Sequence, residues 1–142
     1  MPTRVIHLTL AGVVAAARAA YDAGTLQAQQ QQQAVDDVTC SYTGNCAIGA
    51  ALSAADKKFL KSHSYDNKSS FALVVSGVFV VDGDDPDGDS LLISTIQRRH
   101  DAWVEAVHRG RAPIEVENAR KSFVKDLDKA ENVINARIAL GE

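Results

Sequence analysis

The sequence of 142 residues predicts one small domain of the α+β class, mostly α, with about four helices and a short β element. Its length is common for a single domain and is enough to bury roughly two-thirds of the surface that the unfolded chain exposes. Apolar residues recur every three or four positions in four segments, which indicates amphipathic helices. Only residues 71–81 form an apolar run with high β propensity. We therefore expect residues 1–142 to share one core.

The first helix is expected over residues 9–23, where apolar residues recur at helical spacing. Thr9 suits its N-cap, and Gly24 stands where a C-terminal glycine cap belongs. Residues 25–38 follow and contain the glutamine run Gln29–Gln33. Such a low-complexity stretch is expected to be a linker or an extension of a helix.

The N-terminal segment also has features of a secretory signal, since Arg4 precedes an apolar stretch from Val5 to Ala17. Polar His7 interrupts that stretch, and Arg18 lies inside the would-be cleavage site. We therefore favour a helix of the folded domain.

A short helix is expected over residues 54–62, because Ser53 and Asp56 have the spacing of a capping box. Residues 71–81 are expected to be the β element. Within them, Ser76–Gly77 is either a tight turn between two short strands or a bulge in one strand.

Residues 82–89 carry five aspartates, and clustered carboxylates attract hard cations. The spacing does not fit a calcium-binding EF-hand loop. With Gly88 at the sixth position, Gly83 falls where the first carboxylate is needed and Ser94 where the bidentate glutamate is needed. We expect an acidic turn whose last carboxylate caps the next helix.

Two long helices complete the predicted fold, over residues 90–109 and 115–140. The inner stripe of the first consists of Leu92, Ile96, His100, Trp103 and Val107. The second is amphipathic and, at about 1.5 Å per residue, extends for about 39 Å. Because this length exceeds what a small core needs to cover, part of its apolar stripe is expected to meet another chain, for example in a homodimer.

The charge balance of the chain argues against several partners. Lys and Arg number 15 against 18 Asp and Glu, so the chain lacks the positive surplus of a typical nucleic-acid-binding protein. No stretch approaches the roughly 20 apolar residues of a membrane span. With two cysteines, a cytoplasmic location with reduced thiols is expected.

A nucleophilic site is one interpretation of the segment around Cys46. The residues after Cys46 could begin a short helix, whose N-terminus would lower the pKa of the thiol. His100 would then act as the base. Asp101 is poorly placed to orient His100, because the next residue on a helix points about 100° away. Asn45 or Asp37 could take that part.

Other interpretations use the same residues differently. A zinc site would use Cys40, Cys46 and His100 with His63 or His108, although five residues between the cysteines exceed the usual spacing. A disulfide between the cysteines is sterically feasible. Alternatively, both thiols are small buried hydrophobes and His100 is a core histidine bonded to the backbone. We expect no metal and no cofactor.

The residues between the cysteines resemble a tight turn, which either reverses the chain or presents backbone amides to an anion. We expect the turn from Cys40 to Gly49 to lie against His100. The candidate ligand-binding residues are Tyr42, Gly44, Asn45, Gly49, Asp101 and Trp103.

Three short segments resemble a loose group of small, uncharacterised phage and bacterial proteins. These proteins carry Cys-x-Tyr, then Cys-Ala-(Ile or Val)-Gly, then Leu-Gln-x-x-His-Asp; this chain has Ile96 where Leu is usual. The resemblance covers about a quarter of the chain. It implies a mobile-element origin and cooperation among Cys40, Tyr42, Cys46, Gly49, His100 and Asp101.

We expect a non-enzymatic phage or prophage accessory protein that binds a host protein or a small ligand; inhibition of a bacterial defence system is one role that this expectation includes. The small size, the mild acidity and the long apolar helix favour this function. The alternative is a cysteine-dependent hydrolase or transferase that uses Cys46 and His100. A third interpretation is a dimeric structural protein without a site.

Overall fold

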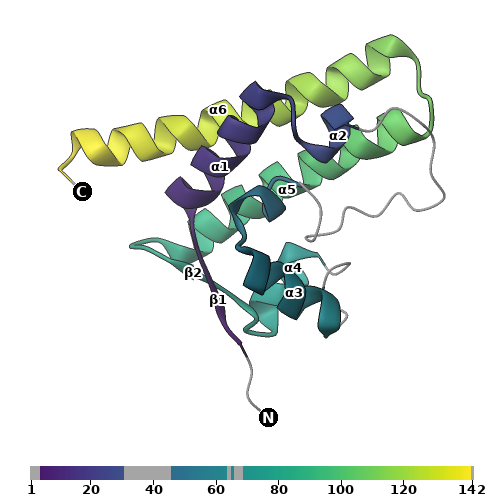
Figure 1. Ribbon diagram of the computed structural model, residues 1–142. Coiled ribbons are helices and arrows are strands. Elements are labelled where there is room, and N and C mark those ends of the chain that lie inside the picture. Colours follow the sequence, from purple (N-terminus) through teal and green to yellow (C-terminus); the bar gives the residue numbers. More distant parts are fainter. Residues whose placement is uncertain (1–3, 31–45, 64, 66–68, 142) are drawn as a thin grey trace.

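The computed structural model describes residues 4–30, 46–63, 65 and 69–141. Figure 1 shows a mostly helical domain with a small two-stranded sheet near one end. The α+β, mostly α class predicted from the sequence is confirmed. No described helix combines the length and the hydropathy needed to cross a membrane.

The centre of the fold is an antiparallel hairpin of two long helices, α5 (Pro86–His108) and α6 (Pro113–Ala139). Helix α1 (Leu10–Ala23) packs against both of them. Gly110 adopts a φ of 63° between the two long helices, a conformation that glycine takes without steric strain.

The two long helices begin earlier than expected, at Pro86 and Pro113 rather than near residues 90 and 115. Proline is favoured at the first helical position, where a backbone N–H has no helical partner. Asp85 caps α5 by accepting a hydrogen bond from the Gly88 backbone N–H at 3.2 Å. The expectation that Asp89, the last carboxylate of the acidic turn, would be the cap was wrong.

The sheet pairs β1 (Ile6–Thr9) in parallel with β2 (Phe79–Asp82). Ile6 and Leu8 point into the core and alternate with two exposed residues, which is the period of a half-buried strand. The sequence analysis did not identify β1. Its last residue, Thr9, is also the N-cap of α1, and it accepts a hydrogen bond from the Gly12 backbone N–H at 3.0 Å.

The predicted β element over 71–81 is correct only at its end. Residues Ser70–Val75 form helix α4, and the chain becomes extended only at Phe79. The Ser69 side chain caps α4 by accepting from the Ala72 N–H at 3.1 Å, and Leu73 is buried. The cap and the packing of Leu73 therefore outweigh the β propensity of the valines. Gly77, with a φ of 83°, lies in a turn between a helix and a strand.

Three short helices complete the described chain. α3 (Ala54–Ser62) has the predicted bounds, and Ser53 caps it by accepting from the Asp56 N–H at 3.1 Å. α2 (Gln27–Gln30) makes the start of the 25–38 segment helical, while residues 31–38 lie outside the described part. The 3₁₀ helix η1 (Gly49–Ala51) follows Cys46.

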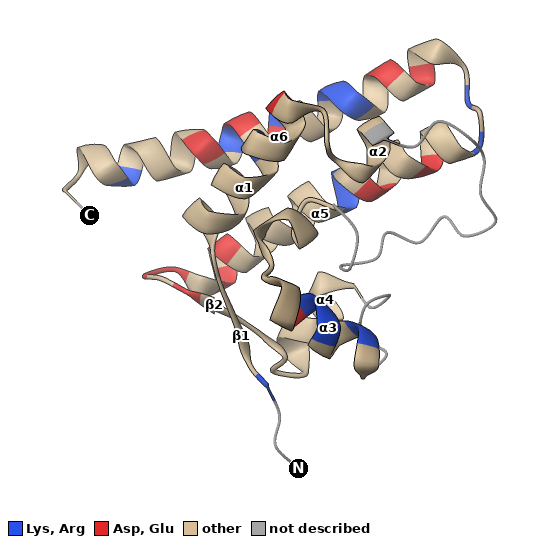
Figure 2. Cartoon of the chain, viewed as in Figure 1, with Lys and Arg blue, Asp and Glu red and all other residues tan. Residues whose placement is uncertain are grey.

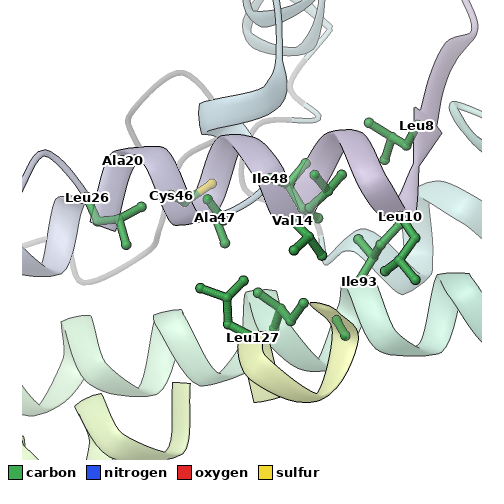
Figure 3. Packing of buried hydrophobic residues seen from close by; sticks show 14 of the residues in the cluster. Leu8, Leu10, Val14, Ala20, Leu26, Cys46, Ala47, Ile48, Ile93 and Leu127 are labelled. Carbon is green, nitrogen blue, oxygen red and sulfur yellow. The ribbon is translucent and has the colours of Figure 1, made fainter. Parts of the chain in front are cut away.

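The core lies where α1 meets α5, α6 and the residues before η1. Figure 3 shows Val14 and Leu10 of α1 facing Ile93 of α5 and Leu127 of α6. Cys46, Ala47 and Ile48 fit beside α1 and are fully buried. The segment that contains Cys46 is therefore part of the hydrophobic core.

A buried ion pair joins the start of α5 to the end of α6, at the open end of the helical hairpin. Asp89 in the first turn of α5 accepts two hydrogen bonds from Arg137 near the end of α6, at 2.8 and 3.1 Å. The Asp89 side chain is 3% exposed and that of Arg137 is 31% exposed. Paired charges largely withdrawn from water hold the antiparallel helices in a fixed register.

Candidate functional site

Cys46 begins the short helical turn that the sequence analysis expected after it. Its backbone carbonyl accepts from the Ala50 N–H at 2.9 Å, and its sulfur accepts from the Gly49 N–H at 3.1 Å. The thiol therefore occupies the place of an N-cap side chain. Because Cys46 has no exposed surface, these contacts lie inside the core.

Gln97 connects this turn to α5. Its side-chain oxygen accepts from the Ile48 backbone N–H at 2.9 Å, and its side-chain nitrogen donates to the Asp101 carboxylate at 2.9 Å. Gln97 is buried, whereas Asp101 is half-exposed on the next turn of α5. The turn from Cys46 to Gly49 is thus fixed to α5 one turn before His100.

His100 is a fully buried histidine bonded to the backbone. Its Nε2 accepts a hydrogen bond from the Ala28 N–H at 3.4 Å. The imidazole meets the rings of Trp103 and Phe123 edge-on, with centroids 6.3 and 5.9 Å away. Its Nδ1 lies 3.9 Å from the Asp101 carboxylate, which is too far for a hydrogen bond.

Gln97, His100 and Asp101 together form what we name the α5 polar cluster. Within it, Gln97 binds the chain at Ile48 and His100 binds it at Ala28. Two parts of the chain 20 residues apart are therefore held on one helix face. The segment of the resemblance that reads Gln-x-x-His-Asp thus makes internal contacts that fix the fold.

The other candidate residues are distributed as follows. Gly49 is buried at the start of η1, and Trp103 is a core residue packed against Tyr21 and Phe123. His63 lies on the exposed end of α3 against the Phe59 ring. Five candidates lie outside the described residues: Asp37, Cys40, Tyr42, Gly44 and Asn45.

The described residues contain no group of three or more His, Cys, Asp or Glu side chains arranged to hold a metal ion. The turn from Cys40 to Gly49 was expected to lie against His100; its described end is bonded instead to Gln97 of α5, and residues 40–45 lie outside the described part. Gln97 was not among the candidate site residues. Gln97 directly follows Ile96 of the inner stripe of α5, and an amide at that position was the sequence signal that could have identified it.

Replacing Gln97 by leucine is expected to lower the free energy of unfolding by about 2 kcal/mol, because the buried Ile48 N–H loses its acceptor. Urea unfolding measures this change, and hydrogen exchange of the Ile48 amide should accelerate. Asp101→Ala leaves the Gln97 oxygen for Ile48 and isolates the loss of the hydrogen bond between Gln97 and Asp101. Thr95→Val on the same helix should change stability by less than about 0.5 kcal/mol. Equal stability of Gln97→Leu and wild type would refute the role of Gln97.

Cys46 is expected to react with iodoacetamide, after reduction, more slowly than a solvent-exposed thiol at neutral pH, because it is fully buried. Mass mapping of peptides separates its rate from that of Cys40. Adding urea up to the unfolding midpoint should accelerate alkylation. Rapid alkylation of folded protein would instead support the cysteine-dependent enzyme.

The geometry thus defines a small helical domain whose candidate site is built into its core. A scan against protein-family models and searches of curated proteins and solved structures found no match to this chain.

Proposed function

We propose that this chain is a non-enzymatic accessory protein that binds a partner protein through the exposed end of α6. One observation carries the proposal. The last turns of α6 continue past the core, so Ile138 and Leu140 are 64% and 80% exposed. Figure 1 shows this end projecting beyond the other helices. A helix end with adjacent apolar residues can insert into an apolar groove of a partner.

The interior of the candidate site supports binding rather than catalysis. Cys46 and His100, the pair considered for nucleophilic chemistry, are both fully buried and both accept hydrogen bonds from the backbone. A catalytic nucleophile and its base must reach a substrate. The buried positions of these side chains favour a structural role, which leaves the molecular surface for function.

We further propose a location, an origin and a target for this protein. We place the protein in the cytoplasm of a bacterial host, as a phage or prophage product, with a host defence protein as its target and inhibition as its effect. This setting rests on the three-segment resemblance, the small size and the mild acidity of the chain. A small ligand or a second copy of the chain is the competing occupant of the α6 end.

The test is affinity capture from bacterial lysate with a tag on the N-terminus, far from the α6 end. The wild-type protein should retain a specific partner, and the double variant Ile138→Glu/Leu140→Glu should lose it. Val75→Glu/Leu91→Glu is the matched control, because it adds the same two charges at apolar residues of α4 and α5 that are 73% and 64% exposed. Absence of any specific partner, or equal capture by the double variant, would contradict the proposal.

Native mass spectrometry separates the competing occupants. A monomer that gains mass only with the captured protein supports the proposal. A dimer that the double variant dissociates would assign the α6 end to a second copy of the chain.

A further inference from the structure

A separate surface of α6 carries a row of lysines. Lys121, Lys125 and Lys129 are exposed and follow one another every fourth residue. At about 1.5 Å per residue, the row extends for about 12 Å along one side of the helix. Ile138 lies 13 positions after Lys125, which places it about 140° around the helix. The row therefore lies on a different side of α6 from Ile138, and it ends nine residues before it.

Arginines form the ion pairs with the carboxylates near this row, and Lys121 attracts Glu117 through space. Arg18 of α1 binds Glu131 and Asp128, and Arg120 binds Glu117. The hydrogen bond from Arg120 holds the pKa of Glu117 below its ordinary value, so that group is an ion at neutral pH. In the part of the chain that the structure describes, the three lysines have no ion pair.

The row borders a hollow of about 520 Å³ on α6, on the side next to α1. The hollow is lined by Arg120, Lys121, Val124, Lys125, Asp128, Lys129 and Asn132. In Figure 2, stretches of α6 coloured for acidic residues alternate with stretches coloured for basic residues. Cations predominate in this lining, although the whole chain has a net charge of −3.

Helix α1 packs beside the part of α6 that carries this hollow. Two contacts place the helices side by side: Arg18 reaches Glu131 at 2.7 Å, and Arg120 donates to the Tyr21 hydroxyl at 2.6 Å. Exposed residues on α1 include Ala11, Ala15 and Ala19, again every fourth residue. Small side chains permit another helix to approach closely, and a helix lying there would have the lysine row along its flank.

We propose that the lysine row of α6, together with the alanine face of α1, docks an acidic α-helical segment of a partner protein. Carboxylates every fourth residue on that segment would match the spacing of Lys121, Lys125 and Lys129. Exposed Asp22 at the end of α1 sets a boundary, because it repels an acidic helix that extends past it.

A protein segment fits this surface better than a nucleic acid. Proteins that bind single strands add aromatic side chains on which bases stack. None of the Phe, Tyr or Trp side chains that the structure describes is exposed. The surface therefore offers cations and a small apolar face without a stacking platform. The inference goes beyond the proposed function and does not depend on the α6 end.

The test uses a fluorescent helical peptide of about 16 residues, with Glu every fourth position and Ala and Leu between. Fluorescence anisotropy should show binding to the wild-type protein that weakens on raising the salt from about 0.05 to 0.5 M. Lys125→Glu/Lys129→Glu should weaken binding about tenfold. The matched control is Lys58→Glu/Lys61→Glu on α3, which changes the net charge equally at exposed positions elsewhere. It should bind within about twofold of wild type.

Two outcomes would overturn the inference. Equal loss in both double variants would show that only net charge matters. Tighter binding of an oligothymidine strand than of the peptide, lost in Lys125→Glu/Lys129→Glu, would assign the surface to a nucleic acid. A peptide with Lys in place of Glu should not bind, and circular dichroism confirms that each variant is folded.

Discussion

Replacing Phe123 by alanine is expected to lower the free energy of unfolding by about 4 kcal/mol. Phe123 is fully buried, and its ring lies between those of Tyr21, Trp103 and His100, with centroids 5.7 to 6.0 Å away. Removing the ring leaves a cavity at the meeting point of α1, α5 and α6. Urea unfolding followed by the fluorescence of Trp103, the single tryptophan of the chain, measures the loss.

Two control substitutions on α6 separate cavity formation from a general effect on the helix. Phe123→Leu fills most of the space and should cost about 1.5 kcal/mol or less. Ile138→Ala, at an exposed position of the same helix, should change stability by less than about 0.5 kcal/mol. If Phe123→Ala were no more destabilising than Ile138→Ala, the aromatic packing described above would be wrong.

Arg137→Met is expected to cost about 3 kcal/mol, because it leaves the Asp89 carboxylate buried without its partner. Methionine retains most of the apolar stem of the arginine side chain, so the loss of stability measures the effect of removing the Arg137 charge. Thermal unfolding should show a decrease of the melting temperature of about 10 °C. The pair lies at the ends of the hairpin, where its loss should also release the last turns of α6.

The control for Arg137→Met is Arg109→Met, which removes an exposed ion pair with Glu105. Such surface pairs contribute about 1 kcal/mol or less. A second variant that also replaces Asp89 by leucine should recover part of the stability, because no buried charge then remains. An equal effect of Arg137→Met and Arg109→Met would show that the Asp89 pair is solvated.

The helices could be predicted because their signals are local. Thr9 and Gly24 mark the ends of α1, and Ser53 marks the start of α3 within a few residues of the groups that they cap. Propensity and spacing alone predicted the wrong element where packing against distant residues determines the secondary structure. Residues 71–75 have the composition of a strand but are a helix, since Leu73 is buried and Ser69 caps the first turn.

The strand β1 and the α5 polar cluster could not be derived in the same way. β1 is a strand because Ile6 pairs with Phe79, and a run of four residues carries too little pattern to reveal such a partner. The spacing of Cys46 and His100 suggested chemistry, whereas their hydrogen bonds to Gly49 and Ala28 fix the backbone. Partners of buried polar groups appear only once the chain has folded.

The contacts of β1 and α1 join residues that are far apart in the sequence. This separation determines the order in which the protein can fold. Ile6 pairs with a strand 73 residues later, and Arg18 reaches Glu131, 113 residues away. During synthesis the N-terminal elements emerge first, and the core that α1 shares with α5 and α6 is complete only when α6 has left the ribosome. A nascent chain stopped before residue 113 would therefore expose the face of α1 that α6 covers.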